Sequence, residues 1–188
     1  MGIRDVLFGR KKLAEPKEDK LFALTTAAVT LQTELGLRSA GVAAVAFKPQ
    51  SSGEFRSAFD DVDKLIEAVA QSCGSKVERT SDEYGFDWVT IRDPDLEDLV
   101  TTVHALAAEL TAQGFGAQLL AAAFRFDGGS HPVYWIYGFK RGAFWPFVPT
   151  EDKNRDNAFE LELKSKLEGE LPVEPDLTRW LALYDAPI

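Results

Sequence analysis

Residues 117–139, AQLLAAAFRFDGGSHPVYWIYGF, contain the pattern that decides the fold. Two apolar runs of strand length, AQLLAAAFRF and PVYWIYGF, flank DGGSH, whose glycines suit a tight reversal of the chain. In the second run, successive residues point to opposite sides of a strand, and apolar side chains occupy both sides. The stretch therefore predicts a hairpin of two strands, with most of its aromatic residues in the core.

Strand signals recur on both sides of this hairpin. The segment AGVAAVAFK (40–48) is small and apolar on both faces, as in a central strand. Segments KVERTS (76–81) and FDWVTIRD (86–93), joined by the turn-like DEYG, predict another hairpin. A shorter segment, AFWPFVP (143–149), extends the sheet, but Pro146 confines it to an edge or a bulge because proline has no N–H to donate.

Helical spacing of apolar residues fills the intervals between the strands. It predicts helices over residues 21–35, 51–74, 93–114 and 156–169. Ser51 and Glu54 match a capping box at the start of the second helix. For the third, we expect Asp93 at the N-cap and Pro94 at the first helical position.

This order of elements predicts an α+β domain in which helices pack against an antiparallel sheet of about five to six strands. Residues 1–16 are expected to form an N-terminal tail, and residues 17–188 a single domain. With the helix over 51–74 set aside, the order resembles that of type III secretion chaperones and YbjN-like domains. A resemblance of this kind concerns the fold and implies no function.

Composition excludes several classes of protein. The net charge of -9 and the pI near 4.8 argue against nucleic-acid binding, which needs clustered Lys and Arg. The single cysteine, Cys73, cannot form an internal disulfide, which fits a reducing cytoplasm. No run approaches the about 18 consecutive apolar residues of a membrane span.

Motifs for catalysis, metal binding and cofactor binding are not found. His104 and His131 lack the spacing of a zinc site, and no G-x-S-x-G nucleophile elbow is present. The glycines of GFGAQ enter a strand, whereas phosphate-binding motifs open a helix. We expect His104 to be partly buried and structural, and Cys73 to be inert at the end of a helix. The prediction is a protein with no enzymatic activity, metal or cofactor.

The segment KRGAFWPFVP, residues 140–149, has two interpretations. Gly142 implies a turn, and turns normally lie at the surface. An exposed aromatic cluster beside basic residues would suit docking of an amphipathic partner helix; the alternative is a structural edge strand. The candidate protein-binding residues are Lys140, Arg141, Phe144, Trp145 and Phe147.

The N-terminal segment MGIRDVLFGRKK also has two interpretations. Apolar residues at helical spacing, followed by a basic run, would suit a short helix at a membrane surface. The alternative is an ordinary frayed tail before the domain. The candidate membrane-surface residues are Ile3, Leu7, Phe8, Arg10, Lys11 and Lys12.

Several phrases together resemble the phage-shock-protein-A-associated family called PspAB. They are LFALTTAAVTLQTELGL, AGVAAVAFKP, DEYGFDWVTIRDPDLEDLVTTVHALAAEL, GFGAQLL, YGFKRGAFWPFVP, RDNAFELELKSKL and LPVEPDLTRW, together with the start MGIRDVLFGRKK. The resemblance implies a bacterial or archaeal cytoplasmic protein of the envelope-stress response, peripheral to the membrane at most. It also implies two partners: PspA, a membrane-binding coiled-coil protein, and an HtpX-type membrane protease. It supplies no catalytic residues.

The leading hypothesis from the sequence is a non-enzymatic adaptor that docks on a helical partner. A second hypothesis is a homodimeric, chaperone-like peptide-binding protein that dimerises through the edge near Trp145. The third is an enzyme of unknown reaction. KRGAFWPFVP and LPVEPDLTRW are the stretches of most interest, because packing of a regular element dictates neither.

Overall fold

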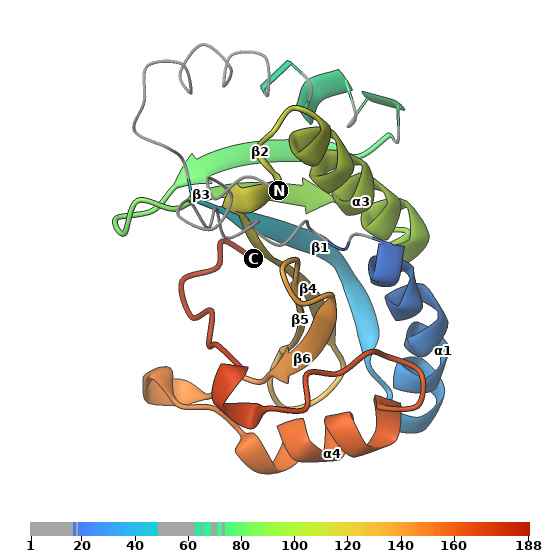
Figure 1. Ribbon diagram of the computed structural model, residues 1–188. Coiled ribbons are helices and arrows are strands. Elements are labelled where there is room, and N and C mark those ends of the chain that lie inside the picture. Colours follow the sequence, from blue (N-terminus) through green and yellow to red (C-terminus); the bar gives the residue numbers. More distant parts are fainter. Residues whose placement is uncertain (1–16, 18, 49–62, 65, 69–70, 73) are drawn as a thin grey trace, which may run out of the picture.

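The computed structural model describes residues 17, 19–48, 63–64, 66–68, 71–72 and 74–188 of the chain. Its centre is a six-stranded sheet in the order β2-β3-β1-β4-β5-β6, with every neighbouring pair antiparallel (Figure 1). The strands are β1 Arg38–Phe47, β2 Lys76–Ser81, β3 Asp87–Arg92, β4 Leu119–Asp127, β5 Val133–Gly138 and β6 Ala143–Phe147. The predicted α+β class and both predicted hairpins, β2–β3 and β4–β5, are confirmed.

Three main helices pack against this sheet. They are α1 Ala23–Leu35, α3 Leu96–Ala112 and α4 Asn157–Leu167, accompanied by the short turns η2 Asp19–Phe22, η3 Gly116–Gln118, η4 Glu151–Lys153 and η5 Leu177–Arg179. The helix predicted over 51–74 lies largely outside the described residues, as do its capping box and Cys73. Where it is described, at 63–64, 66–68 and 71–72, the chain is helical, and Ile66 is buried.

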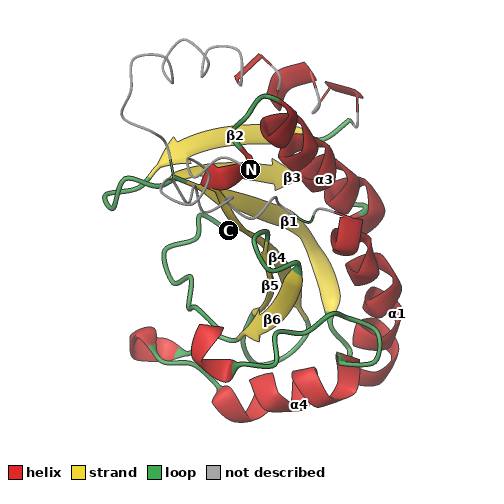
Figure 2. Ribbon diagram, viewed as in Figure 1, coloured by secondary structure: helices red, strands yellow, loops and turns green. Residues whose placement is uncertain are grey.

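The two faces of the sheet are covered differently. Alternation along β5 sends Trp135 and Tyr137 into the core beneath the helices, whereas Ile136 joins a second cluster on the opposite face. That second face is covered by residues 180–188, which form no helix or strand (Figure 2). Among the described residues, no α-helix covers this second face, and the candidate site lies there.

The start of α3 differs from the prediction. Asp95, not Asp93, is the N-cap, and its side chain accepts from the N–H groups of Glu97 and Asp98. The Asp93 carboxylate is buried and accepts from the Ser75 hydroxyl at 2.9 Å and from the Asp95 N–H at 2.9 Å. Because a buried carboxylate needs such partners, Asp93 binds across to the start of β2 and the helix begins two residues later.

Candidate protein-binding site

The aromatic residues of β6 are buried. Phe144 and Phe147 are 0% exposed and Trp145 is 5% exposed, so the expected exposed aromatic cluster is wrong. The alternative, a structural edge strand, describes β6 correctly, and Pro146 occupies the edge position expected for a residue without an N–H. Only Lys140 and Arg141, in the β5–β6 turn, lie at the surface among the five candidates.

Residues 171–188, here called the C-terminal strap, provide the cover. The N–H of Phe144 donates to Pro172 O at 2.8 Å, and the N–H of Glu174 donates to Phe144 O at 2.8 Å. Farther along, Trp145 Nε1 donates to Leu181 O at 3.0 Å. The backbone of β6 at Phe144 is therefore already paired, and a homodimer formed through this edge would first have to displace the strap. Homodimerisation itself stays a prediction.

A cavity of about 570 Å³ remains between the sheet and the strap. We call it the strap pocket. Its floor is formed by small residues on three strands, Ala46, Ala121 and Gly138. Larger side chains at these positions would fill the space. A Cβ at Gly138 would lie 2.9 Å from Trp145 Cζ3, so glycine lets the indole approach the sheet closely. The other lining residues are Phe86, Trp88, Leu120, Lys140, Arg141, Trp145, Thr178, Arg179, Leu181 and Leu183.

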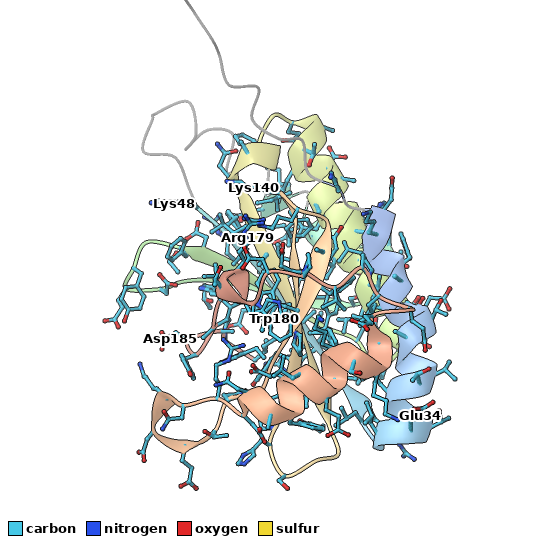
Figure 3. All side chains as sticks on the ribbon, turned by 60° about the horizontal axis from the view of Figure 1, so that its bottom comes forward. Glu34, Lys48, Lys140, Arg179, Trp180 and Asp185 are labelled. Atoms are coloured by element: carbon cyan, nitrogen blue, oxygen red, sulfur yellow. The ribbon has the colours of Figure 1, made fainter. Side chains whose placement is uncertain are left out.

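Among the described residues, every charged side chain that lines the strap pocket is a cation. Lys140 and Arg141 come from the β5–β6 turn and Arg179 from η5. A fourth cation, Lys48, places Nζ 5.8 Å from the ring centroid of the lining residue Phe86. These four are the rim cations; Figure 3 shows Lys48, Lys140 and Arg179 at one end of the view and Glu34 at the other. On a protein of net charge -9, this rim is a local concentration of opposite sign.

Glu174 holds two of the rim cations in place. Its side chain is 5% exposed and lies 3.4 Å from Arg141 Nη1 and 3.7 Å from Arg179 Nη1. Arg179 also contacts Asp176 at 2.9 Å. The Thr178 hydroxyl and N–H donate to Asp176 and, with the charges of Arg179 and Arg141, hold the pKa of Asp176 below its ordinary 3.8. Among the described residues, Lys140 makes no comparable ion pair.

The β2–β3 turn positions the opposite wall of the strap pocket. Trp88 Nε1 donates to Asp82 Oδ2 at 2.9 Å, and the Phe86 N–H donates to Asp82 Oδ1 at 2.9 Å. Desolvation opposes ionisation of Asp82, but the hydrogen bonds from the Trp88 side chain and from the backbone of Phe86, Tyr84 and Gly85 outweigh it and lower the pKa below 3.8. An ionised Asp82 thus orients two of the aromatic lining residues.

Lys17, the first residue that the structure describes, lies against the β5–β6 turn. The Lys17 N–H donates to Phe139 O at 3.1 Å, and the Tyr137 hydroxyl donates to Lys17 O. A Cβ at Gly142 would lie 2.9 Å from Lys17 Cβ, which shows how closely Lys17 lies against the β5–β6 turn. The candidate membrane-surface residues from Ile3 to Lys12 lie outside the described residues.

Polar groups elsewhere in the fold serve packing. His104 is partly buried, tilted against Phe22 at 5.0 Å, with its Nε2 3.6 Å from Asp19, which agrees with the structural role predicted for it. Glu160 is buried and accepts from Arg155 and from the Val148 N–H.

In the part of the chain that the structure describes, no cluster of His, Cys, Asp and Glu could hold a metal ion. None of its helices is long and apolar enough to cross a membrane.

The structure brings together the two stretches that the sequence marked as unusual. KRGAFWPFVP supplies Trp145 and the turn cations, and LPVEPDLTRW supplies Glu174 and Arg179. Sequence reasoning missed the contributions of Ala46 and Trp88, because the small residues of the floor resemble any tightly packed central strand. The alternation along β3 places Trp88 and Ile91 on opposite faces, and this pattern was the sequence signal that could have assigned Trp88 to the pocket side.

Fold and site together define an α+β domain with an apolar, cation-rimmed pocket under a C-terminal strap. The chain belongs to the PspAB family: the family model described as PspA associated protein B matches residues 1–188. Membership implies association with the phage-shock response. No curated protein and no solved structure matches the chain, so the likeness to secretion chaperones rests on element order alone.

Proposed function

We propose that this protein is a non-enzymatic adaptor of the bacterial or archaeal envelope-stress response that binds a PspA-like coiled-coil protein. The observation that carries the proposal is the strap pocket, an apolar cavity whose charged lining residues are all cations. Family membership supports the identity of the partner. The cytoplasmic side of the membrane is where such a partner would be met.

The lining of the strap pocket favours binding over catalysis. Its described residues include no carboxylate, histidine, cysteine or serine that could act as acid, base or nucleophile. The hydroxyl of Thr178 already donates to Asp176 at 2.6 Å. Tryptophan and arginine in a partly open apolar pocket are instead the residues that most often dominate the energy of protein interfaces.

Burial changes the roles of the five candidate residues. Lys140 and Arg141 are exposed and would contact the partner directly, and Trp145 would contact it from the pocket floor. Phe144 and Phe147 are fully buried, so they would act only by holding β6 and Trp145 in position. We therefore assign direct contact to Lys140, Arg141 and Trp145.

Retention of partners from a lysate of the native organism tests the adaptor role. The tagged wild-type protein should retain a PspA-like protein, and the HtpX-type protease is a second expected partner. The double variant Lys140→Glu, Arg141→Glu should retain much less, whereas Lys76→Glu, on β2 at the opposite sheet edge, should retain as much as wild type. If wild type retained only soluble metabolic enzymes, the adaptor proposal would be wrong.

Membrane contact through the N-terminal segment stays a separate prediction. Lys12 is five residues from Lys17 in the sequence. Basic residues there would add about 1 kcal/mol each near an anionic surface, which gives weak and reversible binding. Flotation with anionic liposomes, with and without a PspA-like protein, compares the full chain with one starting at Glu15. Equal recovery of the two proteins with the liposomes would show that the N-terminal segment makes no membrane contact.

A further inference from the structure

We infer that the strap pocket binds an acidic amphipathic helix, which inserts large apolar side chains into the cavity and places carboxylates against the rim cations. This inference rests on the proposed function and specifies the chemistry of the partner segment. Three properties of the site carry it: the shape of its apolar surface, the position of its charges and the state of the sheet edge.

The apolar surface continues from the cavity onto the outside of the strap. Leu181 lines the strap pocket and is 63% exposed, and Leu177 on η5 is 49% exposed. Inside, Trp88 and Trp145 line the cavity. A ligand that fits this surface has to fill the cavity and also cover leucines outside it. A helix with a broad apolar face does both.

The rim cations call for several separate negative charges. They come from the end of β1, from the β5–β6 turn and from η5, and two of them are already held by Glu174. Because three separate segments carry these cations, several carboxylates spread along one ligand suit them. Glutamates three or four residues apart on a helix are spaced by about 5–6 Å and can meet cations on different segments. The acidic remainder of the protein would repel such a helix, which confines it to this rim.

The edge of the sheet argues against an extended peptide. An added strand would need free backbone groups on β6, but the N–H and C=O of Phe144 are bonded to the strap. The helix-in-groove mode needs no backbone pairing. The structure therefore favours a helical segment over a β-strand as the occupant.

Fluorescence anisotropy with synthetic helices tests the inference directly. The probe is a labelled peptide of about 18 residues, or about five turns, with Leu at positions i, i+3, i+4 and i+7 and Glu flanking that face. A matched peptide has Gln at every Glu position. We expect the Glu peptide to bind the full-length protein at least about fivefold more tightly than the Gln peptide, with a difference that shrinks as salt rises.

Two pocket variants and their controls separate the apolar and charged contributions. Ala121→Leu fills the cavity and should weaken the Glu peptide at least about tenfold. The same change at Ala182, exposed and outside the lining, should leave binding unchanged. Lys140→Glu should weaken binding about fivefold, and Lys76→Glu should not. Ala46→Leu is a second variant that fills the cavity, from β1 instead of β4. Thermal unfolding of each variant checks that it is folded.

Each remaining outcome has a defined meaning. Equal binding of the Glu and Gln peptides, or wild-type binding by both folded filling variants, overturns the inference. So does binding of oleate or phosphatidylglycerol vesicles that the filling variants abolish while neither peptide binds, because the occupant is then a lipid. If the filling variants retain as much of a PspA-like protein as wild type does, the inference is overturned but the adaptor role stands. Binding of the Glu peptide without retention of a PspA-like protein would support the inference and overturn the adaptor role.

Discussion

The indole Nε1 of Trp145 donates a hydrogen bond to the backbone carbonyl of Leu181 at 3.0 Å. This bond joins the edge strand of the sheet to the C-terminal strap, and both residues line the strap pocket. It therefore links the shape of the candidate site to the attachment of the strap.

Replacing Trp145 by Phe should loosen the strap. The change removes the bond to Leu181, and we expect the free energy of unfolding to fall by about 0.5–1.5 kcal/mol more than in Trp135→Phe. Trp135 is the control because its buried Nε1 has no partner among the described residues. Denaturant unfolding gives the stabilities. Hydrogen exchange should rise in residues 181–188 for Trp145→Phe alone; equal behaviour of the two variants would contradict the prediction.

Glu174→Gln should weaken the rim of the strap pocket. The buried carboxylate contacts Arg141 and Arg179, whose side chains are about half exposed, so solvent screening limits the loss to about 1 kcal/mol. The control is Glu168→Gln, an exposed partner of Lys164, for which we expect a change below about 0.5 kcal/mol. Urea unfolding of both variants measures the difference. Equal losses would show that Glu174 does not hold the rim.

Acid should remove the contribution of Asp82. Its pKa is lowered in the folded protein, so its ionised form stabilises the fold above the unfolded-state pKa, and that stability is lost as pH falls through the folded pKa. The stability difference between wild type and Asp82→Asn should thus be largest at neutral pH and shrink below about pH 4. Nuclear magnetic resonance titration of the Asp82 carboxyl tests the cause directly. A midpoint at or above 3.8 would contradict it.

A methyl group at Gly142 should displace Lys17 from the β5–β6 turn. Gly142 and Gly85 both have positive φ, so alanine at either position costs about 1–2 kcal/mol of backbone strain. Only at Gly142 would the new Cβ meet Lys17, since nothing lies within 4 Å at Gly85. Gly142→Ala should therefore be the less stable variant, and only there should the Lys17 amide exchange faster. Unchanged protection of Lys17 would count against its anchoring at the β5–β6 turn.

Local patterns were enough to predict the sheet and its hairpins. The alternation of Trp135 and Ile136 between two faces depends only on strand geometry, and the three-four spacing of buried apolar residues in α1 depends only on the helical repeat. Pro146 on an edge strand follows from its missing N–H. These features could be predicted because each depends on residues close together in the chain.

The N-cap of α3 could not be predicted in the same way. Asp93 and Asp95 are the same residue type two positions apart, and local preference alone does not choose between them. The hydroxyl of Ser75, from the start of β2, binds Asp93 in the core and leaves Asp95 to cap the helix. A contact between distant residues decided the boundary.

The sequence by itself determined the fold class, the order of strands along the chain and the family, because periodicity, turn residues and characteristic phrases are properties of neighbouring residues. Only the tertiary structure decided that Trp145 is covered rather than exposed and that Arg141 and Arg179 share one buried carboxylate, Glu174. The strap that creates these relationships has no repeat of its own, since it forms no helix or strand between residues 180 and 188. Its position depends on hydrogen bonds and apolar contacts with sheet residues that are distant in the sequence.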